Sequence, residues 1–208
     1  MAMTKDELDM VHSYMDASHS YLEFGSGEST IYAANASMIK NIDSVESSEK
    51  YITENLKPNI AIANALASGK LRFHIVDIGE TIDWGYPKNQ SKKHLWPNYS
   101  LSVFSRQSNH DLVLVDGRFR VACALNSALN TSEDCSIIIH DFWSRPEYHI
   151  LLKYLKVKNR VDTVCVFGKK RDCDFRKAQA LIRKYQYLPS DGTLFDEMKE
   201  KLKKCLLP

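Results

Sequence analysis

The chain has 208 residues, of which 44% are hydrophobic and 26% charged, and its formal net charge is +2. This length and composition fit one compact domain, and a nearly balanced charge with no long basic cluster gives no electrostatic footprint for a nucleic acid. No apolar run approaches the roughly 20 residues of a membrane span, and the polar start MAMTKDELDM is no signal peptide. Five widely spaced cysteines without a CxxC pair favour reduced thiols. We therefore expect a soluble cytoplasmic protein without a nucleic-acid or membrane partner.

Short apolar runs recur along the chain, and turns with helix-like segments follow most of them. The runs are SYLEF, MIKNIDSV, LRFHIVDI, DLVLVDG, CSIIIHDF and TVCVFG. This alternation is typical of βαβ units, in which a parallel sheet is buried on both faces. We predict a three-layer α/β/α sandwich with a mostly parallel, Rossmann-like sheet of six or seven strands and the first strand central.

Two segments depart from this alternation. Residues 81–99 are rich in proline and aromatic residues, so we predict an irregular loop that either covers a substrate or forms a small satellite core. The aromatic residues of this loop are Trp84, Tyr86, Trp96 and Tyr99. Residues 191–208 have apolar side chains at helical spacing, which predicts a C-terminal amphipathic helix beyond a main domain of residues 1–190. That helix can pack on the domain or on a partner, which leaves a homo-oligomer open.

The stretch YLEFGSGESTIYAANAS, which begins at Tyr21, has the pattern of a strand, a glycine turn and a helix. Such a turn lets a nucleotide-like ligand approach the backbone closely. A dinucleotide fingerprint needs a third glycine where Thr30 stands, whereas Glu46, about twenty residues further on, suits the ribose of either kind of cofactor. Glu23, two places before the first glycine, favours a cofactor with an ammonium and a sulfonium over one with a pyrophosphate.

Four segments in this order, LEFGSG, SVESSEKYI, VDIGE and DLVLVDGRFR, resemble the class I S-adenosylmethionine-dependent methyltransferases. The resemblance covers roughly Tyr21 to Gly168 and implies S-adenosyl-L-methionine as the cofactor. The cofactor-binding residues that it implies are Glu23 near the amino group, Gly25 and Gly27 under the methionine part, Glu46 at the ribose hydroxyls, and Asp77 and Ile78 at the adenine.

Candidate catalytic residues follow the fourth and fifth predicted strands. Asp116 ends the fourth strand, and the pair His140–Asp141 ends the fifth, so all three should meet at the carboxyl edge of the sheet. Catechol-type O-methyltransferases look similar here, but HDF stands where they carry an aspartate–asparagine pair for a metal. A divalent metal therefore remains open but is not favoured over a helix cap at Asp116 and a hydrogen-bonded His140. Without a metal, His140 or Asp141 can act as a general base.

Two arginines follow the same strands closely. Arg118 and Arg145 come just after Asp116 and Asp141, and an arginine fork there can hold a carboxylate or a phosphate. We therefore predict an S-adenosylmethionine-dependent methyltransferase that methylates an oxygen or a nitrogen of a small, preferably anionic, acceptor. The imperfect glycine turn and the missing asparagine motivate the alternative, a catalytically inactive methyltransferase-like binding or assembly module.

Overall fold

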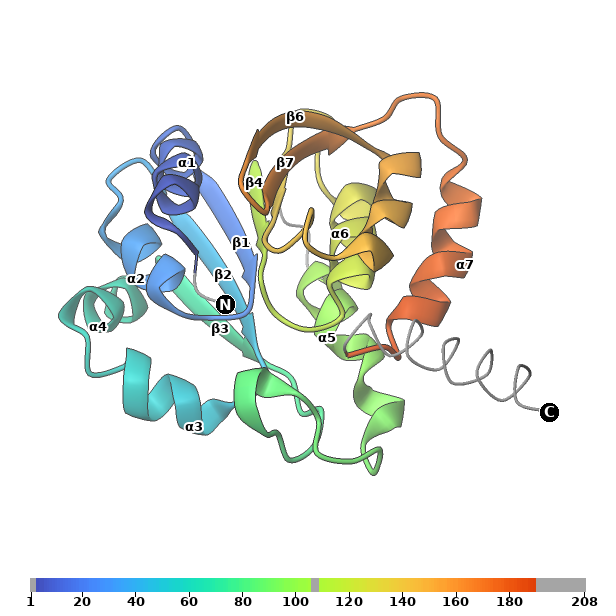
Figure 1. Ribbon diagram of the computed structural model, residues 1–208. Coiled ribbons are helices and arrows are strands. Elements are labelled where there is room, and N and C mark those ends of the chain that lie inside the picture. Colours follow the sequence, from blue (N-terminus) through green and yellow to red (C-terminus); the bar gives the residue numbers. More distant parts are fainter. Residues whose placement is uncertain (1–2, 106–108, 190–208) are drawn as a thin grey trace.

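A seven-stranded sheet forms the middle layer of the protein (Figure 1). The structure, a computed structural model, describes residues 3–105 and 109–189. The strands are β1 (Ser20–Phe24), β2 (Asn41–Glu46), β3 (Leu71–Ile75), β4 (Leu112–Val115), β5 (Ser136–Ile139), β6 (Leu155–Val161) and β7 (Val164–Lys169).

The strand order is β3-β2-β1-β4-β5-β7-β6, and β7 runs in the opposite direction to the other six strands. The predicted fold class, with its sheet of six or seven strands, is confirmed, while the expectation of a central first strand is wrong. The middle strand is β4, not β1, because β5, β7 and β6 all extend the sheet beyond β4. No apolar run marked the seventh strand, β6, because its residues between Leu155 and Val161 are polar or exposed.

Helices cover both faces of the sheet. On one face lie α1 (Lys5–Asp16), α2 (Glu28–Asn35) and α4 (Ile60–Ala67), together with α3 (Glu49–Tyr51) and its π-helical continuation η1 (Ile52–Leu56). On the other face lie α5 (Pro97–Leu101), α6 (Arg120–Asn130) and α7 (Phe175–Tyr185). The remaining short helices are η2 (Asp83–Gly85), η3 (Lys93–Leu95), η4 (Ser102–Ser105) and η5 (Pro146–Lys153).

The inner strands are buried on both faces, which explains their continuous apolar runs. In β1, Leu22 and Phe24 pack in the core under α5 and α6, whereas Tyr21 packs in the core under α1 and α2. Successive residues of a strand point to opposite faces, so one short strand supplies both cores. Both cores hold the carboxyl ends of the strands at one edge of the sheet.

The aromatic segment after β3 divides into two parts. Its first part is irregular, as predicted, and Trp84 there is 74% exposed. Its last part is not a loop, because η3 leads into α5, which has Pro97 in its first turn. Trp96 and Tyr99 are buried in the main core rather than in a satellite core. The first part lies at the surface, and from the last part Tyr99 lines the cavity at the strand ends.

The predicted amphipathic helix of residues 191–208 lies outside the described residues. Within residues 3–105 and 109–189, no helix combines the length and the apolar character needed to span a membrane.

Gly25 is the position where a side chain should harm the fold most. Its φ is +95°, and an added Cβ would lie 2.8 Å from the Gly117 backbone. We expect Gly25→Ala to reduce the free energy of unfolding by about 2–5 kcal/mol, because backbone strain and overpacking add. The matched control is Gly69→Ala, where φ is +74° and no atom lies within 4 Å, so only the strain of about 1–2 kcal/mol remains. Urea unfolding measures both variants, and equal losses would contradict the steric argument.

Candidate active site

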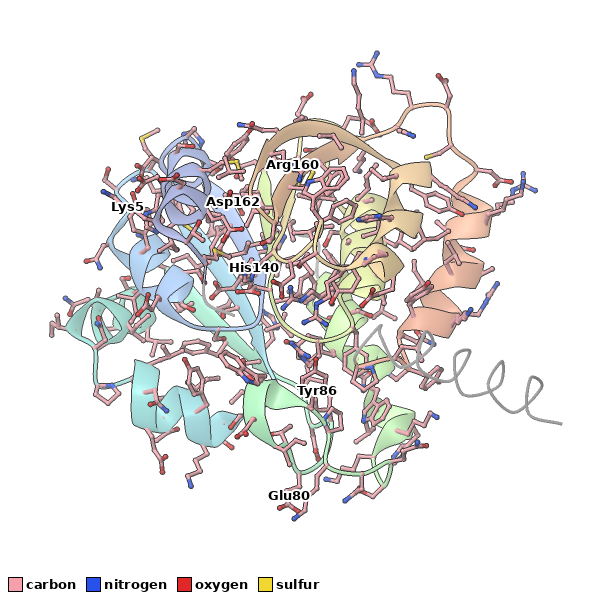
Figure 2. All side chains as sticks on the ribbon, viewed as in Figure 1. Lys5, Glu80, Tyr86, His140, Arg160 and Asp162 are labelled. Atoms are coloured by element: carbon pink, nitrogen blue, oxygen red, sulfur yellow. The ribbon has the colours of Figure 1, made fainter. Side chains whose placement is uncertain are left out.

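A cavity of about 700 Å³ opens at the carboxyl ends of the strands. Its wall is formed by residues 25–29, 46–48 and 116–118, by the loop residues Thr81, Ile82 and 84–86, by Tyr51, Tyr99 and Arg120, and by Asp141 with Arg145 after β5. Met3 and Leu8 close one side. In Figure 2, His140 lies near the middle of the molecule and Tyr86 on the loop below it. A cavity at this edge is where ligands of open α/β sheets bind.

The glycine turn forms part of the cavity wall. Gly25 N donates a hydrogen bond to the Val45 carbonyl at 2.9 Å, and Gly27 precedes the first residue of α2. Because Gly25 has no Cβ, the turn contacts the backbone of Gly117 after β4. Thr30, which stands at the third-glycine position, is fully buried, and its hydroxyl accepts a hydrogen bond from Gly27 N at 2.9 Å. The two predicted glycines therefore line the cavity. Thr30, which replaces the third glycine of the dinucleotide fingerprint, stabilises the turn through its hydrogen bond with Gly27 N.

Glu23 lies beneath this turn and does not line the cavity. Its buried carboxylate accepts hydrogen bonds from four hydroxyl groups, those of Tyr21, Ser29, Thr30 and Ser44. Burial raises the pKa of Glu23, and these hydrogen bonds oppose that rise only in part. The described contacts of Glu23 thus join the glycine turn to β1 and β2. Its predicted contact with a cofactor amino group stays a prediction.

Glu46 lines the cavity at the end of β2. Its Oε1 accepts hydrogen bonds from Ser47 N at 2.6 Å and Ser48 N at 2.9 Å, and its Oε2 accepts one from Ser26 N at 3.2 Å. Ser48, not Glu46, caps the following helix by accepting a hydrogen bond from Tyr51 N at 3.1 Å. Backbone groups from two loops therefore orient the Glu46 carboxylate at the cavity wall.

Asp77 and Ile78 do not line the cavity. The Asp77 side chain is exposed and pairs with Lys92. Ile78 is fully buried, and its carbonyl accepts a hydrogen bond from Trp96 Nε1 at 2.9 Å. The wall on this side comes from later residues of the same connection, among them Tyr86, one of the aromatic residues of the loop that was predicted to cover a substrate.

Asp116, His140 and Asp141 meet at the ends of β4 and β5, as predicted. The His140 Nδ1 atom lies 2.7 Å from Asp116 Oδ1, and its Nε2 lies 3.6 Å from Asp141 Oδ1. Both aspartates line the cavity, whereas His140 is buried behind them. Burial would raise the pKa of Asp116, but the His140 hydrogen bond and the charge of Arg120 outweigh it, so that this pKa is lowered. Asp116 is therefore ionised at neutral pH.

Arg120 is a residue of this site that the sequence motifs did not identify. Its buried guanidinium donates from Nη1 to the His140 carbonyl at 2.6 Å and to Asp141 Oδ2 at 3.2 Å. Its Nη2 lies 3.1 Å from both the carbonyl and the Oδ1 of Asp116. The only signal in the sequence is the spacing of GRFR, in which the second arginine falls on the first turn of α6.

Arg120 also bears on the question of a metal. Its guanidinium contacts Asp116 and Asp141, so a positive charge already occupies the place between these two carboxylates. Among the residues that the structure describes, no group of three or more His, Cys, Asp or Glu side chains is arranged to hold a metal ion.

Arg118 and Arg145 both line the cavity. The Arg118 guanidinium lies 4.1 Å from the centroid of the Tyr86 ring, and its buried Nε has no hydrogen-bond partner in the described part of the chain. Arg145 Nη2 lies 3.9 Å from Asp141 Oδ2, and its side chain is 39% exposed. Both predicted substrate-binding arginines are thus accessible from the same cavity as Asp116.

Comparisons with known proteins agree with this architecture. No protein-family model and no curated protein matches the sequence. A methyltransferase-like protein from Silicibacter pomeroyi DSS-3 is similar, with 25% identity and a TM-score of 0.77 over 90% of this chain and 96% of that one. An RNA methyltransferase from Salinibacter ruber, solved with S-adenosyl-L-homocysteine, shares 14% identity and the fold, with a TM-score of 0.51 over 84% and 97%. The chain shares the fold of these methyltransferases, and the resemblance found in its motifs is confirmed.

The buried carboxylate of Glu23 predicts a pH dependence of stability. Its pKa is raised by folding above the ordinary value of about 4.3, so its contribution is full below that pH and is lost as the pH rises through the folded pKa. We compare the free energy of unfolding of the parent protein with that of Glu23→Gln. The stability advantage of the parent over the variant should decrease as the pH rises from 4 to 7. Urea unfolding of both proteins at each pH measures this difference. A difference that grows with pH would show that the hydroxyl groups lower the pKa instead.

Proposed function

We propose that the protein transfers a methyl group from S-adenosylmethionine to an oxygen or nitrogen of a small anionic acceptor. The observation that carries this proposal is the separation of charge around one cavity. Glu28 and Glu46 lie on the side of the glycine turn, whereas on the side of β4 and β5 the three arginines Arg118, Arg120 and Arg145 outnumber the two aspartates Asp116 and Asp141. S-adenosylmethionine carries a sulfonium and an ammonium, which favour the acidic side. An anionic acceptor favours the basic side.

The cofactor half of the cavity fits this assignment. The glycine turn offers a wall without side chains, and Glu46 presents a carboxylate already oriented by backbone N–H groups. A carboxylate at this place can accept hydrogen bonds from both ribose hydroxyls. Ser47 and Tyr86 line the wall beyond Glu46, so we assign them, in place of Asp77 and Ile78, to the adenine. The bound sulfonium supplies a methyl group that is already activated.

The acceptor half supplies orientation and a proton acceptor. Asp116 is ionised, lines the cavity and is held through Oδ1 by His140 and Arg120. An acceptor O–H or N–H that donates to Asp116 has its lone pair turned toward the methyl carbon, and alignment of this kind supplies much of the rate. Bound S-adenosylmethionine would supply the methyl group and would leave as the neutral thioether, which keeps the electron pair of the methyl–sulfur bond. The acceptor proton passes to Asp116.

The preference for an anion comes from the two arginines. The buried Nε of Arg118 is a donor without a partner in the described residues, and such groups are rare unless a ligand satisfies them. Arg145 contributes a second guanidinium that is accessible from the cavity. A carboxylate or a phosphate can accept two parallel hydrogen bonds from one guanidinium.

Two measurements test the proposed function. Calorimetry should detect binding of S-adenosylhomocysteine and no binding of NAD. Transfer of a radiolabelled methyl group to pooled anionic metabolites should then give a labelled product that Asp116→Ala abolishes. Binding of S-adenosylhomocysteine without any labelled product would favour the inactive module, and binding of NAD alone would overturn the proposal.

Glu46→Gln should weaken cofactor binding more than it weakens the fold. Removing the carboxylate charge weakens hydrogen bonds worth about 1.5–3 kcal/mol each, so we expect S-adenosylhomocysteine affinity to fall about tenfold to a hundredfold. Calorimetry measures the affinity, and a thermal melt measures stability. The control is Ser48→Ala, which removes the helix cap and should lower the melting temperature with little change in affinity. Unchanged affinity in Glu46→Gln would exclude the ribose assignment.

A further inference from the structure

The first helix carries a buried carboxylate that reaches the candidate catalytic residues. Glu7 in α1 is 2% exposed. Its Oε1 accepts hydrogen bonds from Thr163 N at 2.8 Å and Thr163 Oγ1 at 2.6 Å, and its Oε2 accepts one from Thr4 N at 2.8 Å. The same Oε2 lies 4.0 Å from His140 Nε2. The turn between β6 and β7 and the start of α1 therefore fix the carboxylate in front of the imidazole.

Glu7 is charged at this position. Burial would raise its pKa, but the hydrogen bonds from Thr163 and Thr4 and the neighbouring His140 lower it below the usual value. A buried anion of this kind strongly favours an N–H donor on the ring that faces it.

His140 connects Glu7 to the cavity. The charged groups that face it are Glu7 on α1, Asp116 after β4, Arg120 on α6 and the adjacent Asp141. Its Nδ1 is hydrogen bonded to Asp116 at 2.7 Å, and its Nε2 faces Glu7 and Asp141. The ring itself does not line the cavity, so its contact with an acceptor is through Asp116.

We infer that Glu7 is a positioning residue, which holds the His140 ring with Nε2 toward α1 and Nδ1 against Asp116 Oδ1. The role of Asp116 in this chain rests on the proposed function, whereas the link between Glu7 and His140 does not. The carboxylate of Glu7 at Nε2 thus orients the imidazole, and the imidazole orients the carboxylate of Asp116 at Nδ1. Helix α1, which precedes the sheet, thereby becomes part of the catalytic machinery.

The link is tested without any acceptor by nitrogen–proton NMR of the histidine rings. His140→Gln assigns the His140 signals among the seven histidines. In Glu7→Gln we expect the His140 nitrogen shifts to move and exchange of its ring N–H proton to accelerate at least tenfold, because the anion that holds the ring is gone. The control is Thr4→Ala, which removes the helix cap but keeps the Glu7 charge. Unchanged His140 signals in Glu7→Gln would overturn the inference, and so would equal changes in both variants.

The catalytic consequence is tested with the acceptor found in the labelling experiment. Glu7→Gln should slow methyl transfer by about tenfold to a hundredfold, as expected for a misplaced reacting group, and should alter its pH profile. S-adenosylhomocysteine affinity should stay within about twofold, because Glu7 does not line the cavity. Glu7→Asp should restore part of the rate. If no acceptor is labelled, the proposed function fails while the NMR result still decides the link.

Discussion

One buried guanidinium holds together the two strand ends on which the candidate site depends. Arg120 donates hydrogen bonds to the carbonyls of Asp116 and His140, at the ends of β4 and β5. Just beyond these points the backbone is left-handed at Phe119, with φ +55°, and at Asp141, with φ +59°. Each such residue costs about 1–3 kcal/mol, and hydrogen bonds to a charged group contribute about 1.5–3 kcal/mol each. The hydrogen bonds of Arg120 are thus sufficient to hold both bends, and the bends place the aspartates at the cavity.

Much of this fold is predictable from the sequence because its inner strands are buried on both faces. Such strands have continuous apolar runs, and the turns and helices between them indicate parallel order. Strand β6 lacks this signal, because it lies at the edge of the sheet and exposes its residues from Lys156 to Arg160. The position of β1 also escaped prediction, since the strand order depends on how the chain crosses over and not on local composition.

The site was predictable where a residue's role follows from its place at a strand end. Asp116, His140 and Asp141 met because parallel strands end at one edge. No comparable rule predicts where a side chain within a loop points. Asp77 is an example, because its side chain turns outward and pairs with Lys92. Buried hydrogen-bond networks could not be predicted from the sequence either. The partners of Glu7, for example, lie up to 156 positions away in the chain.

The exposed strand β6 has a consequence for how this sheet meets other molecules. An edge strand presents unpaired backbone groups, onto which a strand from another molecule can add. Here Lys156, Lys158 and Arg160 lie along that edge, and an irregularity between Val157 and Asn159 interrupts the regular pairing with β7. A strand from another molecule that paired with β6 would lie close to these positive charges. It would also have to follow the irregular backbone of β6 between Val157 and Asn159. The sheet therefore ends at β6 in a border that discourages aggregation.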